Sequence, residues 1–356
     1  MPRFRVGRPP TSSPARSAPE ELPTPDIATA LTTWRFDPVA ALVIVIVASL
    51  YLAGVVRYDR ARRGARPAGA GVDGAAAFRG GAPAPARWPR RRVVGFLVLG
   101  LGSFAVIEFG FLGVYSGELR FAFSTRIALL LLVVPALLAT GRPAELAAHT
   151  LRGRARALLE AAATSRLARL TGNAVFGTVL ALAVFCCFLT PLAGWARTTP
   201  AVSDALDVLV PALGAAVVIP LAGGAAVSGL FLAAEFMLAF AELVLDAIPG
   251  IVLRLSDTVL DGVTSVVGGP AWFPSPLRDQ QLSGDLLWFI AELADIPVLV
   301  FLFIRWSRHD RREARSLDDL SDADMAALTA AHLGRPAANP SPAAADPIRP
   351  TPEGRP

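Results

Sequence analysis

Apolar residues run in long blocks along this chain, and polar residues gather between the blocks. A transmembrane helix needs about 20 mostly apolar residues, and seven blocks come close to that length or exceed it. Their approximate bounds are residues 38–56, 93–114, 122–140, 172–192, 205–222, 226–248 and 282–304. The pattern therefore predicts an all-α fold, a polytopic membrane helix bundle of about seven transmembrane helices.

The composition agrees with a membrane protein. The 356 residues are 53% hydrophobic and 18% charged, with a mean hydropathy of +0.50, whereas soluble domains carry about 25% charged residues. All 34 basic side chains are Arg, and they lie mainly in the gaps between apolar blocks. Because that distribution fits membrane topology, we expect a lipid bilayer as the partner of this basic chain and no nucleic acid.

The arginine-rich gaps predict which side of the membrane each loop faces. Residues 57–92 hold ten arginines, residues 141–171 hold six, and another cluster runs from Arg305 to Arg315. Basic loops stay in the cytoplasm, which predicts an outside N-terminus and an inside C-terminus in a bacterial-type cell (plasma) membrane. The five arginines of residues 1–37 oppose this orientation, but the ten in the next loop should outweigh them.

The same pattern divides the chain into three parts. Residues 1–37 are rich in Pro, Ser and Arg and are predicted to be a disordered tail, without a visible cleavable signal peptide. Residues 38–306 are predicted to form the seven-helix membrane domain, with cytoplasmic loops at 57–92 and 141–171. Residues 307–356 are predicted to be a cytoplasmic, largely disordered C-terminal tail.

The last two predicted spans carry acidic residues at membrane depth, where unpaired carboxylates are costly. Each set follows the spacing of one helix face: Glu235, Glu242 and Asp246 in the sixth span, and Asp285, Glu292 and Asp295 in the seventh. No Arg lies inside either predicted span. The two stripes could face each other and enclose a polar cavity that binds a cation, relays protons or contacts a partner. The alternative is a structural interface in which protonated carboxyl groups form hydrogen bonds.

Two further ionisable residues lie in the second and third spans. Glu108 is near the end of a span that runs outward, and Arg126 is near the start of a span that runs inward. Both are therefore expected at similar depth in the outer part of the bilayer. A buried ion pair between adjacent helices would neutralise both charges. The alternative is that each side chain extends separately to the outer surface.

Few side chains suit a metal or a catalytic role. Cys186 and Cys187 are soft donors for Cu(I), but neighbours on a helix point about 100° apart and cannot easily share one ion. We expect them, like Met237, to be packing residues, and we assign no metal ligand and no cofactor. The three histidines lie outside the predicted spans, and HExxH and GxSxG motifs are missing from the sequence. The sequence therefore predicts no enzyme.

Short motifs mark the ends of several predicted spans. In chain order they are Trp34-Arg35-Phe36-Asp37-Pro38, Leu50-Tyr51-Leu52-Ala53-Gly54-Val55, Trp88-Pro89, Val133-Val134-Pro135-Ala136-Leu137-Leu138, Gly141-Arg142-Pro143, Leu189-Thr190-Pro191-Leu192, Asp279-Gln280-Gln281 with Gly284 and Trp288, and Arg305-Trp306. Together, in this order and spacing, they resemble the CtaG-type cytochrome c oxidase assembly proteins. That family consists of seven-helix bacterial membrane proteins linked to copper delivery to haem–copper oxidases.

This sequence departs from the family that it resembles at the family's histidines. Family members usually carry two histidines four residues apart early in the third span, and another near the fifth. Counting back from Gly141-Arg142-Pro143 puts the pair at Phe123 and Ile127, and neither side chain can bind a metal. The resemblance therefore implies the fold and the assembly role, with copper possible only at another place.

The resemblance implies a membrane-embedded assembly factor for a haem–copper respiratory oxidase, degenerate for copper binding and acting through a partner membrane protein. That partner would be a cytochrome c oxidase subunit or another assembly protein. The alternative function is a permease for a small solute or a cation that uses the acidic stripes. Many transporters show an internal repeat and matching broken helices, and we find neither in this sequence.

Overall fold

A computed structural model describes residues 27–64, 87–166, 174–221, 229–263 and 275–318. Within these ranges the chain forms helices and connecting turns, without a β-strand. The all-α prediction is therefore confirmed. The chain divides into two compact units, Met1–Leu302 and Phe303–Pro356, and the bundle described below belongs to the first. Most of the two predicted tails lies outside the described residues.

Five of the described helices are long and apolar enough to cross a membrane, or six if one bent pair of helices counts as a single span. The multi-pass membrane bundle is therefore confirmed. The seventh predicted segment lies in α15 (Pro276–Asp318), which is not among the five. The seven-span count and the orientation stay predictions.

The first span is α2 (Pro38–Gly64), which follows a short helix, α1 (Ile27–Thr32). Asp37 caps α2, because its Oδ1 accepts hydrogen bonds from the backbone N–H groups of Val39 (2.7 Å) and Ala40 (2.9 Å). The cap satisfies two of the amide groups that a helix start leaves unpaired. The predicted start of the first span is therefore also the observed start of a helix.

The second and third spans each contain a π-helical stretch. The second comprises α3 (Arg90–Val94), η1 (Gly95–Leu101), α4 (Gly102–Phe109) and α5 (Phe111–Tyr115). The third comprises α6 (Arg120–Ala128), η2 (Leu129–Val133) and α7 (Val134–Ala139). A π turn holds more residues than an α turn, so it changes the side of the helix on which the following residues lie.

The third span lies at the centre of the core. About 61% of its apolar stretch is buried, against 11% for α2. Leu130, Leu131 and Val134 belong to the main hydrophobic cluster. Gly214 of α13 (Pro200–Leu221) allows a close approach, because a Cβ there would lie 2.1 Å from the carbonyl oxygen of Leu131. Polar side chains on the third span are therefore held away from solvent and need partners inside the bundle.

The fourth predicted span, residues 172–192, is followed at once by a second helix. α11 (Ala174–Cys187) and α12 (Pro191–Thr198) meet at a 78° bend, and Pro191 occupies the first turn of α12, where proline is well tolerated. Arg197 lies beyond the predicted end of the fourth span and is a buried residue of α12. The chain therefore bends by 78° at the predicted end of the fourth span, and a short second helix follows.

The sequence also predicts an outside loop over residues 249–281, and the helices on both sides extend into that range. α14 (Gly229–Leu255) continues past Pro249, and α15 already begins at Pro276. A proline is tolerated inside a membrane helix because neighbouring groups can satisfy the freed carbonyl. The two helices approach closely at Gly250 and Gly284, where a Cβ on Gly250 would lie 2.8 Å from the carbonyl oxygen of Gly284.

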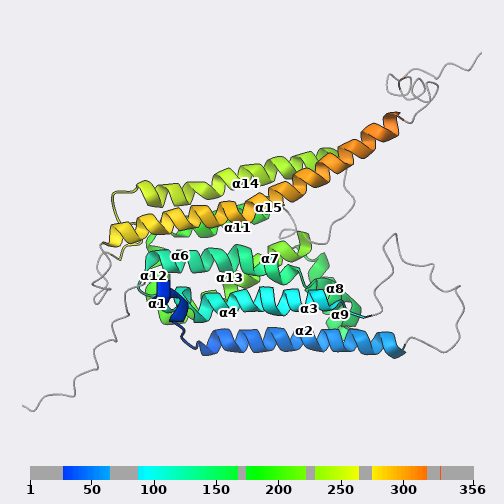
Figure 1. Cartoon of the computed structure of the whole chain (residues 1–356), viewed down its shortest axis with the longest axis horizontal. Coiled ribbons are helices and arrows are strands. Elements are labelled where there is room, and N and C mark those ends of the chain that lie inside the picture. The colour runs from blue at the N-terminus through cyan, green and yellow to red at the C-terminus, as the bar shows by residue number, and fades with distance from the viewer. Residues whose placement is uncertain are drawn as a thin grey trace, which may run out of the picture. The chain divides into compact units, whose positions relative to one another are not determined.

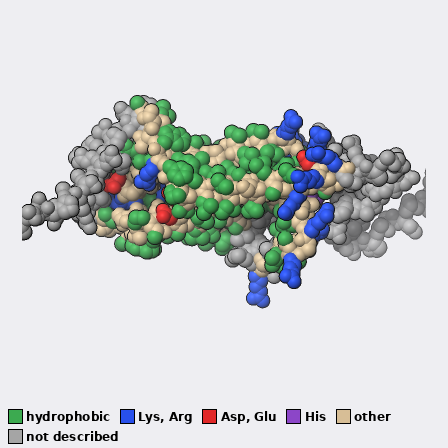
Figure 2. All heavy atoms as spheres, turned by 90° about the horizontal axis from the view of Figure 1, so that it is seen from below, with side chains coloured by type: hydrophobic (Ala, Val, Ile, Leu, Met, Phe, Trp, Pro, Cys, Tyr) green, Lys and Arg blue, Asp and Glu red, His purple; other side chains and the backbone are tan. Residues whose placement is uncertain are grey.

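Helices of the first unit lie side by side (Figure 1), and charged side chains gather at the ends, with a broad apolar band between them (Figure 2). The arginine-rich end is formed by the last turn of α2, by α3 and by α9 (Gly153–Thr164), next to α8 (Pro143–Thr150). Its side chains include Arg62, Arg63, Arg90, Arg91, Arg154 and Arg156. The described parts of the first two predicted basic loops thus lie on the same side of the bundle, as a shared side of a membrane requires.

Candidate functional site: two buried ionic clusters

Arg126 and Glu108 form a buried ion pair between the third and second spans. Arg126 Nε donates a hydrogen bond to Glu108 Oε2 at 2.9 Å, and Nη2 lies 2.7 Å from the same oxygen. Their side chains are 4% and 1% exposed. The structure therefore contains the pair that the sequence suggested, rather than two side chains extended separately to the surface.

A second carboxylate reaches Arg126 from α13. Asp207 Oδ1 pairs with Arg126 Nη2, and Arg126 Nη1 donates hydrogen bonds to Ser203 Oγ (3.0 Å) and Ser116 Oγ (3.4 Å). We name Arg126, Glu108, Asp207, Ser203 and Ser116 the Arg126 cluster. The guanidinium group of Arg126 joins the second, third and fifth spans, so removal of this group would affect three helices at once.

The Arg126 cluster lies in a strongly negative environment. Carboxylate oxygens of Asp37, Asp204 and Asp207 lie within 4.8 Å of one another, and Glu108 is close enough to Asp37 to interact electrostatically. The sequence analysis missed Asp207, although it lies inside the predicted fifth span. The rule that drew attention to Glu108, an acidic residue at membrane depth, would also have found Asp207.

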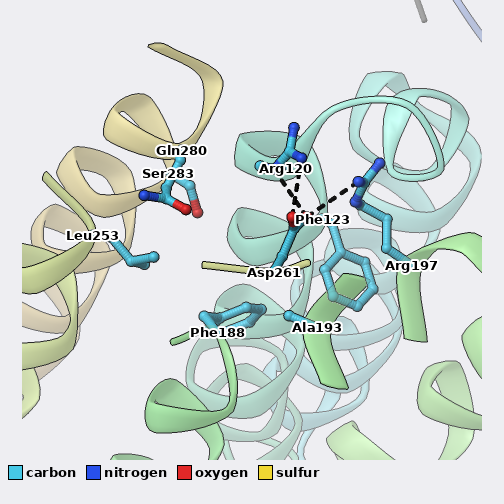
Figure 3. Close-up of a pocket in the computed structure, with 9 residues that line it drawn as sticks. All are labelled: Arg120, Phe123, Phe188, Ala193, Arg197, Leu253, Asp261, Gln280 and Ser283. Atoms are coloured by element: carbon cyan, nitrogen blue, oxygen red, sulfur yellow. Dashed lines mark hydrogen bonds and ion pairs between the residues drawn. The ribbon is translucent and has the colours of Figure 1, made fainter. Parts of the chain in front are cut away.

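The Arg120 cluster, made of Arg120, Arg197, Asp261 and Asp279, lies at the start of α6. Figure 3 shows the first three of these residues. Arg120 Nη2 donates to Asp261 Oδ1 at 3.0 Å, and Arg197 Nη2 donates to Asp261 Oδ2 at 3.2 Å. Arg197 Nη1 also donates to the carbonyl oxygen of Gly117 at 2.7 Å. Two buried arginines thus share one carboxylate, and Arg197 also bonds to the backbone of the turn before α6.

Asp279 connects this cluster to α15 by capping α6. The backbone N–H groups of Arg120 and Phe121 donate to its two oxygens at 2.8 and 3.0 Å, where the helix dipole favours a negative charge. The next residue, Gln280, accepts a hydrogen bond from the N–H of Leu260 and donates one to the carbonyl of Thr258. The start of α15 therefore forms hydrogen bonds with both α6 and the segment that follows α14.

A pocket with a volume of about 20 Å³ lies against the Arg120 cluster (Figure 3). Arg120, Arg197 and Asp261 form its polar side, and Phe188 and Leu253 lie on its apolar side. The volume suits about one water molecule. This pocket therefore offers room for a bound water rather than for an organic substrate.

The position at which the resemblance implies a histidine lies in the same pocket. Phe123 lines it, and Ile127, one turn later, is a buried residue of the main core. A phenyl ring and an alkyl chain have no lone pair for a metal. The residues present at this place do not fit a copper ion.

Only some of the predicted acidic stripe residues come together. Asp246 of α14 is 1% exposed and interacts electrostatically with Glu242 on the same helix and with Asp295 of α15. We name these three residues the carboxyl cluster. The side chain of Glu235 lies outside the described residues. The pocket described above is lined by other residues.

The other two stripe residues have partners of their own. Asp285 Oδ1 lies 3.1 Å from Arg254 Nε, and both side chains are about two-fifths exposed. Glu292 Oε1 accepts a hydrogen bond from Trp288 Nε1, one turn earlier on the same helix, at 2.5 Å. Arg254 lies just past the predicted end of the sixth span, so the extension of α14 supplies a cation that the sequence analysis did not consider.

Two cysteines and one methionine lie in the described spans. Cys186 is half-buried and Cys187 is exposed, both as free thiols, and Met237 is 61% exposed on α14. Among the described residues, neither Cys belongs to a group of three or more His, Cys, Asp or Glu side chains that could hold a metal.

Motif residues from three segments meet at Tyr51, towards the arginine-rich end. Tyr51 Oη donates to the carbonyl oxygen of Gly141 at 2.9 Å and accepts a hydrogen bond from Trp88 Nε1 at 3.1 Å. Its ring stacks on Phe96, with centroids 3.9 Å apart. The sequence motifs around Tyr51, Trp88 and Gly141 therefore serve one polar contact that joins three segments.

Glu145 joins the first two basic loops near the same end. It forms ion pairs with Arg92 at 3.1 Å and Arg142 at 3.2 Å. Partial burial raises the pKa of this carboxyl, but its hydrogen bonds to Arg142 and Arg92 outweigh burial and hold the pKa below its usual value. Glu145 is therefore ionised at neutral pH.

The fold and these clusters define a polytopic helical membrane protein whose polar contacts inside the bundle bind helices to one another. Residues 49–309 match the model of the cytochrome c oxidase caa3 assembly factor family (Caa3_CtaG). Because the match covers well over half of the sequence, the chain belongs to this family of oxidase assembly factors.

Curated relatives are similar over a shorter stretch. An uncharacterised protein of Mycobacterium bovis and another of Mycobacterium tuberculosis are each 39% identical to this chain over 90 residues. That stretch is 25% of this chain and 14% of either relative, so the match covers about a seventh of their length. No solved structure matches the chain.

Proposed function

We propose that this protein assists the assembly of a haem–copper respiratory oxidase in the cell membrane by binding a partner membrane protein. The partner is an oxidase subunit or another assembly protein. The family match over residues 49–309 carries the proposal. Buried polar groups join the helices to one another, which is consistent with a rigid protein that presents a defined binding surface. We propose no catalytic step.

We propose further that the protein does not bind copper at the place that the resemblance indicates. Phe123 and Ile127 provide no ligand atom, and Arg126, on the same stretch of helix, is a cation already paired with Glu108 and Asp207. The carboxylates of the Arg126 cluster are hard donors and poor ligands for Cu(I). Cys186 and Cys187 adjoin on one helix and point in different directions.

Deleting the gene and measuring the oxidase tests this proposal. We expect the deletion strain to lose haem–copper oxidase activity and assembled oxidase in its membranes, and the wild-type gene to restore both. Arg120→Gln should restore less, because it removes the buried positive charge that pairs with Asp261. Arg156→Gln, on an exposed helix where the pair with Glu160 is about 60% exposed, is the matched control and should restore fully.

A normal oxidase in the deletion strain would contradict the proposal. Partner binding is tested by crosslinking in native membranes followed by purification of this protein, and an oxidase subunit or assembly protein should be recovered. Substrate-dependent flux in proteoliposomes, together with an intact oxidase in the deletion strain, would favour the permease instead.

A further inference from the structure

Three carboxyl groups lie on α14 and α15 within the apolar part of the bundle. Glu242 and Asp246 lie in the stretch of α14 that is long and apolar enough to cross a membrane, and Asp295 lies on α15, which runs beside it (Figure 1). Asp246 interacts electrostatically with both other groups, and Asp295 interacts with Glu242. The two helices approach closely at Gly250, one turn from Asp246, and at Gly284, about three turns from Asp295.

Two oxygens of this carboxyl cluster have no hydrogen-bond partner. Asp246 Oδ1 and Asp295 Oδ2 are buried and unpaired, and the whole Asp246 side chain is 1% exposed. Glu242 has a hydrogen bond to Thr178 of α11, which packs along α14. A buried oxygen without a hydrogen-bond partner is costly. A bound ligand that neutralises these carboxyl groups would lower that cost.

The nearby charged side chains on α14 and α15 are paired with other residues. Arg254, on α14, pairs with Asp285, and Glu292, one turn before Asp295, accepts a hydrogen bond from Trp288. Among the described side chains of α11, α14 and α15, we find no arginine paired with Glu242, Asp246 or Asp295. Three carboxylates at this depth would repel one another and would lack the solvation that water gives a charge.

We propose that Glu242, Asp246 and Asp295 form a proton-binding site inside the membrane domain. A protonated carboxyl group is neutral, so it removes the repulsion and needs less solvation than a carboxylate, and its O–H can donate a hydrogen bond. The site does not depend on the proposed role in oxidase assembly.

A proton fits this cluster better than a metal ion does. Metal ions are held by several oxygens that converge within a few ångströms. Within the part of the chain that the structure describes, the group with that convergence is Asp37, Asp204 and Asp207, not the carboxyl cluster. The three carboxyl groups are near enough to influence one another but do not surround a common point.

Labelling of the intact wild-type protein tests the site directly. Dicyclohexylcarbodiimide is an apolar reagent that attacks protonated carboxyl groups, and mass spectrometry locates its adducts. In proteoliposomes at neutral pH we expect adducts within the carboxyl cluster, decreasing as the pH rises. Asp285, which is paired with Arg254, and the exposed Glu160 should remain unlabelled, while a water-soluble carbodiimide should label Glu160.

Infrared spectroscopy gives a second readout that does not depend on access of the reagent. The double variant Asp246→Asn with Asp295→Asn should lose absorbance of protonated carboxyl groups, and Asp285→Asn, on the same helix, should keep it. The amides resemble a protonated carboxyl group in size and polarity, so folding should be retained. Lack of adducts together with unchanged absorbance in the double variant would overturn the proposal. Protection from labelling by Na⁺ at constant pH would overturn it in favour of a sodium site.

Discussion

Asp279 caps the helix that Arg120 begins, although 159 residues separate them in the sequence. Its carboxylate accepts two backbone hydrogen bonds and also lies 3.5 Å from the Arg120 guanidinium group. The start of α15 is therefore held against α6, at the centre of the bundle, by contacts between residues far apart in the sequence.

Removal of Asp279 should destabilise the protein strongly. Asp279→Ala takes away a helix cap and leaves buried arginines with less compensating charge, so we expect a loss of about 3 kcal/mol in the free energy of unfolding. Asp279→Asn keeps a cap oxygen and should cost less. Unfolding in mixed micelles measures both. Asp285→Ala is the control, because its pair with Arg254 is exposed and should be worth at most about 1 kcal/mol. Equal losses for Asp279→Ala and Asp285→Ala would contradict this account.

Arg126→Ala and Glu108→Ala should both destabilise the bundle, but unequally. Arg126→Ala leaves two buried carboxylates without their cation, with an expected cost of about 3–5 kcal/mol. Glu108→Ala should cost less, because Asp207 still balances the guanidinium charge. In a double-mutant cycle, the double variant should cost less than the sum of the single variants. Additive losses would show that the two side chains are not energetically coupled.

Histidines introduced at positions 123 and 127 should create a copper affinity that the wild type lacks. Phe123→His with Ile127→His places two imidazoles one turn apart on one helix face, beside the pocket that Phe123 now lines. Titration with Cu(I) against a competing chelator should show binding by the double variant only. Tight binding by a variant that keeps Phe123 and Ile127 but carries Cys186→Ala and Cys187→Ala would disprove the proposed lack of copper binding at this place.

Reporter fusions should place both basic regions in the cytoplasm. A fusion after Arg92 and a fusion after Arg315 should each give the cytoplasmic signal, because arginine-rich segments resist translocation. A fusion within residues 256–263, between α14 and α15, should read outside. A periplasmic signal from either of the first two fusions would require a different span count or orientation.

The sequence predicted the helices and the Glu108–Arg126 pair because one rule governs both. Apolar stretches of sufficient length cross the membrane, and a charge inside such a stretch needs a partner. The same rule applied to Asp207 would have completed the Arg126 cluster. For these residues, the physical cause is visible in the local sequence.

The Arg120 cluster could not be predicted in the same way. Arg120 and Arg197 lie in segments that read as a turn and a loop, where arginines are usually solvated. Their burial depends on the bend before α12 and on contacts with Asp261 over 141 and 64 residues. Such contacts depend on how the helices pack, which periodicity and composition do not specify.

The π-helical stretch η1 determines where Glu108 lies on its helix. Each residue of an α-helix turns the chain by about 100°, so deletion of one residue from Gly95–Leu101 would swing the Glu108 carboxylate roughly a quarter-turn away from Arg126. The acidic partner would then have to stand at a neighbouring position in the sequence. Homologues with a shorter second span should therefore be aligned by the side of the helix that meets Arg126, and not by residue identity alone.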